Sequence, residues 1–202
     1  MKVKTINFVG EGYVECKSCF YSAQDVLSDD TQFAFSTGIN KMVGDIDSGI
    51  WAVSYLLSMY QHNSKDCILF SEPKVQVNDS FISLENLMLY SCYMDESYPL
   101  FRASASVKDL VTKGLSHYQS KLSPNEIKDI FHLDSNRFEH SLSETGSEIY
   151  KAMSAIAYCY KKTILCFPWM SQKRFKRYET HMYDLLNILN DMNSLVILPI
   201  GK

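Results

Sequence analysis

The residues whose types and spacing could do chemistry lie in one short stretch, Val43-Gly-Asp-Ile-Asp-Ser-Gly-Ile-Trp51. A phosphate-binding loop has the pattern G-x-x-x-x-G-K-[ST]: its glycines let backbone N–H groups face the phosphates, its lysine neutralises them and its hydroxyl holds Mg²⁺. Gly44 and Gly49 have this separation, but Ile50 and Trp51 take the lysine and hydroxyl positions. The stretch therefore has the spacing of a phosphate site without its cation or its magnesium ligand.

Acidic residues make the same stretch still less suited to an anion. Asp45 and Asp47 add negative charge, and at ~4 Å with an effective dielectric near 20 such like-charge contacts cost on the order of several kcal/mol. An alternative role is structural, because either aspartate could cap the helix that follows, whose first N–H groups have no partner within the helix. The candidate phosphate loop consists of Gly44, Asp45, Asp47, Ser48, Gly49, Ile50 and Trp51.

The elements that must position this loop follow from the hydrophobic pattern. Ile50–Met59 is apolar over too many residues for an ordinary strand and predicts a buried helix. Ser123-Pro-Asn-Glu126 is a capping signal that opens another helix. Short apolar stretches predict strands at Lys4–Val9, Gln32–Phe35, Cys67–Phe70, Leu87–Tyr93, Thr163–Phe167 and Ser194–Leu198. Helical spacing predicts further helices at Val107–Leu115, Glu126–Phe131, Ser147–Tyr160 and Phe175–Met192.

The order of these elements indicates the fold class. Strand, helix and strand alternate in the second half, which favours parallel strands joined by right-handed crossovers. Several short strands precede the loop. We therefore expect an α/β fold with a mostly parallel sheet, flanking helices, an antiparallel β annex near the N-terminus and a small helical subdomain.

The landmarks, taken in order, resemble an ATP-binding cassette (ABC) transporter ATPase domain, as a degenerate member of the P-loop NTPase superfamily. After the loop and its helix, the strand ending at Tyr93 runs into Met94–Phe101, where Asp95 stands at the position of the family's Gln loop. A helical segment follows, and then a counterpart of the family's signature, formed by Ser143, Thr145, Gly146, Ser147 and Glu148. The resemblance implies one domain over residues 1–202, with a helical subdomain at about 97–146.

The resemblance also places the second nucleotide site, and its chemical residues are missing as well. The strand that should end in magnesium-binding and water-polarising carboxylates ends in Phe167, Pro168 and Trp169, and no Asp or Glu occurs from Ser154 to Tyr178. Phosphoryl transfer depends on such groups. We therefore expect no catalytic residue and no cofactor, with binding of ATP and Mg²⁺ as the alternative.

A partner is the expected context for such a chain. In the family, the signature of one subunit faces the nucleotide held by the other, so the residues at 143–148 could act in trans, or they could simply cap the helix that follows. We expect a dimer with another cassette ATPase subunit, a complex with a membrane permease, or both. The alternatives are a stand-alone regulatory or binding protein on the same scaffold and an ABC-type ATPase that still binds ATP.

Composition narrows the other possibilities. The net charge of −3, from 20 basic and 23 acidic residues, gives no general reason to expect nucleic acid. The apolar runs are far below the roughly 20 residues that cross a bilayer, and no signal peptide is visible. The expected location is the cytoplasm, with peripheral association at the inner face of the membrane.

Cysteines, histidines and one basic cluster remain to be assigned. The six cysteines favour buried reduced thiols, with zinc or redox chemistry at Cys16 and Cys19 as the less favoured alternative, and the five histidines show no metal spacing. We expect no metal site. Residues 161–178 carry six basic residues and no acid, which fits a solvated helix start or a contact with phosphates or a polar partner.

Overall fold

The computed structural model describes residues 3–9, 12–18, 21–27, 32–46, 48–59, 67–68, 73–101 and 104–202. Asp47 of the candidate loop, the Cys19 position and the end of the predicted strand at 69–70 lie outside the described residues.

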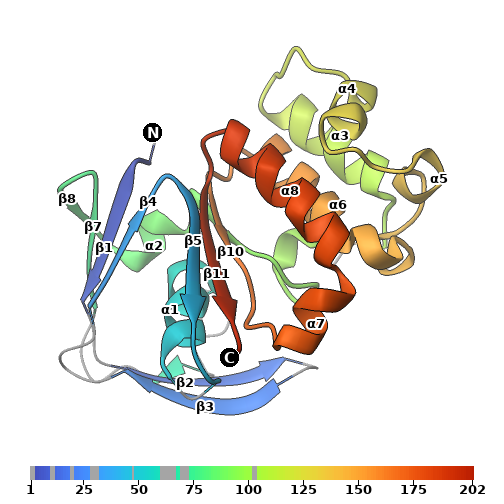
Figure 1. The fold of residues 1–202 in the computed structure, drawn as a ribbon. Coiled ribbons are helices and arrows are strands. Elements are labelled where there is room, and N and C mark those ends of the chain that lie inside the picture. The colour runs from blue at the N-terminus through green and yellow to red at the C-terminus, as the bar shows by residue number, and fades with distance from the viewer. Residues whose placement is uncertain are drawn as a thin grey trace.

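A four-stranded parallel sheet forms the centre of the fold, with the strand order β5-β11-β10-β9 (Figure 1). The strands are β5 (Gly38–Val43), β11 (Leu195–Ile200), β10 (Ile164–Cys166) and β9 (Ser91–Tyr93). All three neighbouring pairs are parallel, which confirms the parallel α/β class predicted from the order of the elements. Because the strands run the same way, their carboxyl ends meet at one edge of the sheet, where ligands bind in open α/β folds.

Helices cover both faces of this sheet (Figure 1). Helix α1 (Ile50–Met59) packs on β9, β10 and β11, and α8 (Glu179–Asp191) lies on the other side against β5 and α6 (Ile149–Cys159). The predicted burial of α1 is confirmed, since every residue from Ile50 to Ser58 is buried. Its buried Ser54 has a hydrogen-bond partner outside the helix: the Ser54 hydroxyl donates to the carbonyl of Phe167 at 2.6 Å. That bond ties the helix after the candidate loop to the strand of the second site.

Two antiparallel sheets lie beside this core, on the side of α1 and below it (Figure 1). One has the order β4-β1-β7-β8 and the other β3-β2-β6. Their strands are β1 (Thr5–Val9), β2 (Gly12–Ser18), β3 (Tyr21–Leu27), β4 (Gln32–Ser36), β6 (Cys67–Ile68), β7 (Lys74–Val77) and β8 (Ser80–Ile82). All of these strands come from the first 82 residues, before the chain reaches α2.

A group of helices follows β9 in the chain and packs beside α6 (Figure 1). It consists of α3 (Val107–His117), α4 (Pro124–Ile130) and α5 (Ser135–Phe138). The capping box predicted before α4 is present: the Glu126 side chain accepts from the Ser123 N–H at 2.7 Å, and the Glu126 N–H donates to the Ser123 hydroxyl.

Two predicted elements are corrected. The strand predicted at Leu87–Tyr93 is extended only over Ser91–Tyr93, because the residues before it form the short helix α2 (Leu84–Leu87), which buries Leu84 and Leu87 at helical spacing. The apolar run had no strand partner there, and Leu89 is exposed.

The single helix predicted at Phe175–Met192 is two helices. Helix α7 (Gln172–Arg177) starts at an N-cap, where the Ser171 hydroxyl accepts from the N–H of Arg174, and it ends at Tyr178 before α8 begins. The predicted apolar face of α8 is buried as expected at Met182, Leu185, Leu186 and Leu189. The continuous apolar spacing concealed the break because Tyr178, which lies between the two helices, packs against the core like the apolar residues of α8.

No helix in the described ranges is long and apolar enough to cross a membrane.

Candidate functional site

The candidate phosphate loop occupies the bend between a strand and a helix, as its pattern predicted. It leaves β5 at Val43, and α1 begins at Ile50. The Gly44 N–H donates to the carbonyl of Ile200 at 3.0 Å, which places the start of the loop at the carboxyl edge of the sheet. Gly49 has a φ of +85°, a backbone conformation that favours glycine, so this glycine is required by the turn into the helix.

The space beside Gly44 is occupied by other side chains of the candidate loop. The Ser48 hydroxyl and N–H both donate to the carbonyl of Asp45, at 2.6 and 3.1 Å. A methyl group added at Gly44 would lie 2.5 Å from the Ser48 Oγ and 3.4 Å from the Ile50 Cδ1. The space next to Gly44 therefore holds a serine hydroxyl and an isoleucine side chain.

The residues at the lysine and hydroxyl positions belong to the hydrophobic core. Ile50 and Trp51 are both buried, and they pack with the rest of α1 in the main core cluster. Asp45 is exposed, and its carboxylate lies 3.9 Å from the Lys202 ammonium, which is also exposed. Such a surface pair contributes little to stability, and it brings the last residue of the chain to the loop.

An aromatic side chain closes the edge of the sheet where the second site was predicted. Phe167 is fully buried after β10, and Trp169 follows it across Pro168. The Trp169 indole N–H donates to the carbonyl of Gly44 at 3.1 Å. A methyl group on Gly201 would come within 2.7 Å of the same indole ring, so the ring also packs closely on Gly201. The candidate phosphate loop and the segment at 167–169 are thus adjacent, and the contact between them is the hydrogen bond from Trp169 to Gly44.

Asp95 lies in a different environment from the phosphate loop. It follows β9 and is buried, and its Oδ1 accepts the Ser97 N–H at 2.9 Å. Asp95 lines a cavity together with part of the signature-like segment, and none of the loop residues lines that cavity. Asp95 therefore follows the strand, as predicted, and its carboxylate is used in a hydrogen bond that stabilises the turn at residues 95–97.

The signature-like residues form two consecutive 3₁₀ turns before α6, at Leu142–Glu144 and Gly146–Glu148. The Thr145 hydroxyl is buried and donates to the carbonyl of Leu142 at 2.7 Å. Gly146 has a φ of +58° and is exposed. Ser143, Gly146 and Ser147 reach the cavity surface, so three of the five predicted residues remain available to a ligand or a partner.

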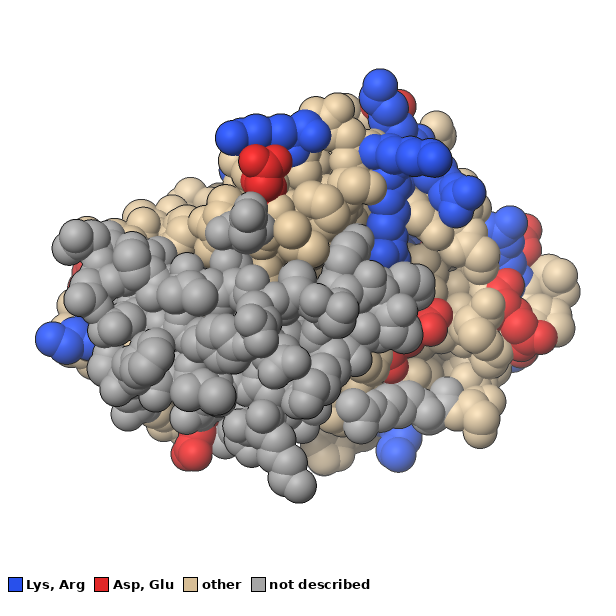
Figure 2. Space-filling view, turned by 90° about the horizontal axis from the view of Figure 1, so that it is seen from below, with Lys and Arg blue, Asp and Glu red and all other residues tan. Residues whose placement is uncertain are grey.

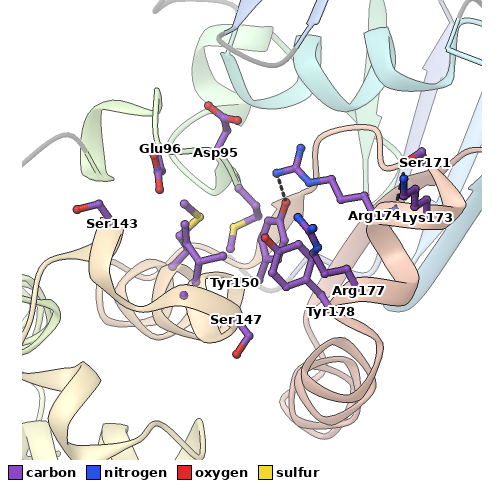
Figure 3. A pocket seen from close by; sticks show the side chains of 14 residues that line it. Asp95, Glu96, Ser143, Ser147, Tyr150, Ser171, Lys173, Arg174, Arg177 and Tyr178 are labelled. Carbon is purple, nitrogen blue, oxygen red and sulfur yellow. Dashed lines mark hydrogen bonds between the residues drawn. The ribbon is translucent and has the colours of Figure 1, made fainter.

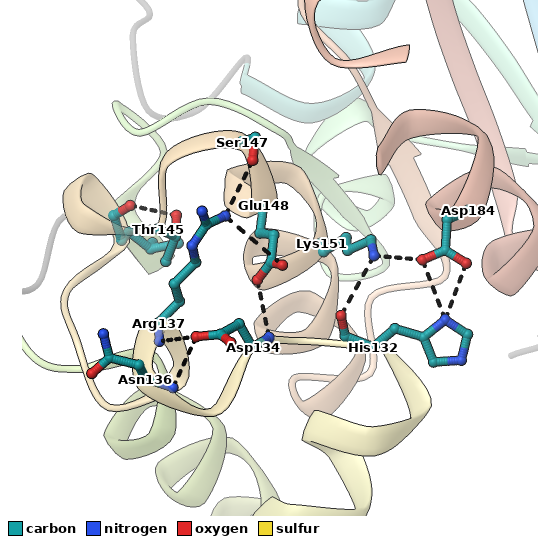
Figure 4. Close-up of polar contacts among 10 residues, drawn as sticks. His132, Asp134, Asn136, Arg137, Thr145, Ser147, Glu148, Lys151 and Asp184 are labelled. Atoms are coloured by element: carbon teal, nitrogen blue, oxygen red, sulfur yellow. Dashed lines mark hydrogen bonds and ion pairs between the residues drawn. The ribbon is translucent and has the colours of Figure 1, made fainter. Parts of the chain in front are cut away.

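A polar network ties this segment to α5 (Figure 4). Arg137 donates to the Ser147 hydroxyl at 3.1 Å and lies 3.8 Å from the buried Glu148 carboxylate. The other Glu148 oxygen accepts the N–H of Asp134 at 3.1 Å. Glu148 is therefore a structural residue that positions the turn at 146–148.

The cavity itself has a volume of about 860 Å³ and lies between the turn after β9, the start of α6 and helix α7 (Figure 3). Arg174 and Arg177 face it from α7, and Tyr150 and Tyr178 line it beside them. The Arg174 guanidinium donates to the Tyr150 hydroxyl at 3.2 Å.

Buried thiols make up a further set of predicted residues. Cys92, Cys159 and Cys166 are free and buried, as the sequence indicated for Cys92 and Cys166. Burial raises the pKa of the Cys159 and Cys166 thiols to about 12 and also raises the pKa of Cys92. These thiols are therefore protonated and unreactive at neutral pH. Among the described residues, no group of three or more His, Cys, Asp and Glu side chains could hold a metal ion.

No family model matches this chain, and no curated protein matches it in sequence. Solved structures do resemble it. A protein of Pyrococcus furiosus described as an ABC transporter ATP-binding protein superposes with a TM-score of 0.62 at 14% identity, over 98% of this chain and 90% of that one. A bacterial Atm1-family ABC exporter with ATP bound gives a TM-score of 0.58 at 10% identity, over 100% of this chain and 35% of the exporter chain. The chain has the fold of an ABC ATPase.

The cassette fold explains how the distant landmarks come together. In this fold the loop after β5 and the segment after β10 lie at one edge of the sheet, which is where Gly44 and Trp169 meet. The resemblance stated from the order of the landmarks is confirmed at the level of the fold.

The cavity residues that the sequence missed are Tyr150, Arg174 and Arg177. Tyr150 was noticed only as part of a helix, and Arg174 and Arg177 only as members of a basic cluster. The signal that could have found the arginines is their spacing of three residues, which puts both on one face of a helix, within thirty residues that contain no acid.

Proposed function

We propose that this chain is a cassette protein that does not hydrolyse ATP and that works as a partner of another cassette ATPase or of a membrane permease. The observation that carries the proposal is the closed edge of the sheet, where Trp169 bonds to Gly44 and Ile50 fills the lysine position. Phosphate binding in such a loop needs inward-facing N–H groups and a cation. Here a serine, an isoleucine and an indole occupy the surroundings of the first glycine.

The charge of the described residues supports the same proposal. Asp45 places a carboxylate on the loop, and the nearby Lys202 is exposed and only loosely paired with it. Phe167, a buried apolar residue, follows β10 (Ile164–Cys166) directly, where magnesium chemistry would need a carboxylate. We infer that neither half of a nucleotide site is equipped for catalysis in this chain.

The signature-like turns support a role in trans. Ser143 and Gly146 are exposed at the surface of the cavity, and the network through Arg137 and Glu148 holds the turn at 146–148 in position. A rigid, exposed turn of small residues is suited to close contact with a partner. We further propose that residues 1–202 act as one cassette domain, with residues 97–146 as its helical subdomain, held at the inner face of a membrane by a permease.

Turnover of ATP by the purified chain tests the first part. We expect no Mg²⁺-dependent phosphate release above that of Gly44→Val, a variant whose side chain would collide with the Ser48 hydroxyl and distort the loop. Release that is present in the wild-type chain and abolished by Gly44→Val would show a working loop and overturn the proposal. Equal release from both proteins would identify a contaminating ATPase.

Recovery of the chain from its native cells, followed by mass spectrometry, tests the second part. We expect a cassette ATPase or a permease among the recovered proteins. Ser143→Trp, which adds bulk at an exposed position of the signature-like turn, should reduce that recovery, whereas Ser116→Trp on the exposed face of α3 should not. Recovery of no such protein, or equal recovery with both variants, contradicts a role in trans.

A stand-alone binding protein is the second candidate, and the cavity beside α7 is the observation that favours it. Its volume of about 860 Å³ lies within the range of small-molecule sites. This candidate predicts a monomeric chain that binds a ligand without any cassette partner.

A further inference from the structure

The cavity beside α7 is lined by apolar side chains on one part of its surface and by charged side chains on the rest (Figure 3). Met94, Ile149 and Met153 provide the apolar surface. Sites for small molecules are mostly apolar, with a few polar groups that fix the orientation of the ligand. The chemistry of the ligand is therefore decided by the charged side chains around that apolar surface.

The wall formed by α7 is basic. Lys173, Arg174 and Arg177 line the cavity, and Figure 2 shows Lys and Arg side chains gathered on the side of the molecule where α7 lies. No Asp or Glu occurs between Glu148 and Glu179 in the sequence. Within the described ranges, no carboxylate lies within ion-pair distance of Lys173 or Arg177. The positive charges of Lys173 and Arg177 are therefore not neutralised by an ion pair within the described part of the chain.

One of the arginines, Arg174, is hydrogen-bonded to a tyrosine. The Arg174 guanidinium donates to the hydroxyl of Tyr150, whose side chain is buried. The rings of Tyr150 and Tyr178 pack edge to face, with their centroids 5.9 Å apart. Arg174 is thus fixed before a ligand arrives, which lowers the entropy lost on binding.

The opposite wall orients the ligand. Asp95 and Glu96 lie across the cavity from Arg177 and Tyr178 (Figure 3). Asp95 is buried and accepts the Ser97 N–H, while Glu96 is exposed at the rim. A negatively charged ligand group would be repelled from this side and attracted toward α7.

We propose that this cavity is a binding site for small polyanions, specifically for phosphate or polyphosphate groups held by Arg174 and Arg177. Guanidinium groups bind phosphate oxygens through two parallel hydrogen bonds and remain charged at all physiological pH values. The site is separate from the loop at 44–49 and needs neither that loop nor Mg²⁺. It provides a way for a cassette protein with a closed phosphate loop to respond to a phosphorylated molecule.

Calorimetric titration of the full chain with inorganic pyrophosphate, without Mg²⁺ and at about 0.15 M salt, where the Debye length is about 8 Å, tests the proposal. We expect saturable binding that Arg177→Gln and Arg174→Gln each weaken by about tenfold or more, the loss expected for a hydrogen bond to a charged group. Lys176→Gln is the matched control, because it removes the same charge from an exposed position of α7 that does not line the cavity. It should change the affinity by less than about twofold, since exposed charges at a distance are screened.

Three results would overturn the proposal. They are the absence of saturable binding at millimolar pyrophosphate, an equal loss with Lys176→Gln and Arg177→Gln, and a loss with Gly44→Val, which would move the anion to the loop. Arg177 is exposed, so Arg177→Gln keeps the test valid if Arg174→Gln fails to fold. ATP turnover is measured separately. Absence of pyrophosphate binding would therefore not affect the proposal that the chain does not hydrolyse ATP, and detection of ATP hydrolysis would not affect the proposal of an anion site in the cavity.

Discussion

The indole N–H of Trp169 donates to the carbonyl of Gly44 at 3.1 Å, across 125 residues of sequence. This bond joins the segment after β10 to the first glycine of the candidate phosphate loop. The same ring packs on Gly201 at the end of the chain. One side chain thus links the candidate loop, the segment after β10 and Gly201 at the carboxyl edge of the sheet.

Trp169→Ala should lower the free energy of unfolding by about 2–3 kcal/mol, less than for a fully buried tryptophan because the side chain is only partly buried. Trp169→Phe keeps most of the packing and loses the hydrogen bond, so it should cost about 1 kcal/mol. Urea unfolding measures both values. Equal costs for the two variants would mean that the hydrogen bond, and not the packing, holds the edge closed.

Trp169→Glu should not create ATP turnover. The variant places a carboxylate after β10, but Ile50 still provides no cation for the phosphates. A phosphate-release assay with ATP and Mg²⁺ should give the same rate as the wild-type chain. A clear increase in rate would show that the loop retains more of its function than we propose.

Gly114→Ala should destabilise the protein by about 1–2 kcal/mol, although alanine favours a helix over glycine by about 1 kcal/mol. The added methyl group would lie 2.8 Å from the Cys159 Cβ and from the Tyr160 ring, so α3 would be forced away from α6. Ser116→Ala, at an exposed position of the same helix, is the control and should be neutral or slightly stabilising. Thermal melting of both variants checks the prediction, and a stabilised Gly114→Ala would contradict the close packing.

Asp184→Asn should cost about 2–3 kcal/mol, because it leaves the buried Lys151 ammonium without its ion-pair partner. The Asp184 carboxylate also accepts from the ring of His132 at 3.0 Å, which links α8 to the segment after α4 (Figure 4). The exposed pair of Lys108 and Glu139, at 2.8 Å, is the comparison, and Glu139→Gln should cost less than about 1 kcal/mol. Chemical unfolding of the two variants should separate them clearly, and similar costs would show that burial does not strengthen the first pair.

The same aspartate should make stability depend on acid pH. Burial acts to raise the pKa of Asp184, but hydrogen bonds from Lys151 and His132 outweigh it and hold the pKa below its ordinary value. A carboxyl with a lowered folded-state pKa contributes stability above its unfolded pKa of roughly 4, and the contribution is lost as the pH falls through its folded value. The melting temperature should therefore drop below about pH 4, by less in Asp184→Asn than in the wild-type chain. Parallel pH profiles for the two proteins would contradict this assignment.

Local signals in the sequence predicted much of the secondary structure. The capping box at Ser123 and Glu126 depends on residues three positions apart, and it is present. The buried helix after the loop was predicted because its apolar run is longer than a strand allows. The errors at Leu87–Tyr93 and at Tyr178 have one cause: an apolar residue fits a strand, a helix or a helix junction equally well, and only its packing partner decides among them.

The sequence by itself determined which chemical groups the two candidate segments lack, because the absence of a lysine at position 50 and of any carboxylate from Ser154 to Tyr178 is a fact of residue identity that no folding can change. Only the tertiary structure decided what stands in their place. The parallel register of β5, β11 and β10 brings Trp169 to Gly44, and the packing of α7 beside the start of α6 brings two arginines to a buried tyrosine. Such meetings depend on strand order and helix packing over more than a hundred residues, and no spacing along the chain encodes them.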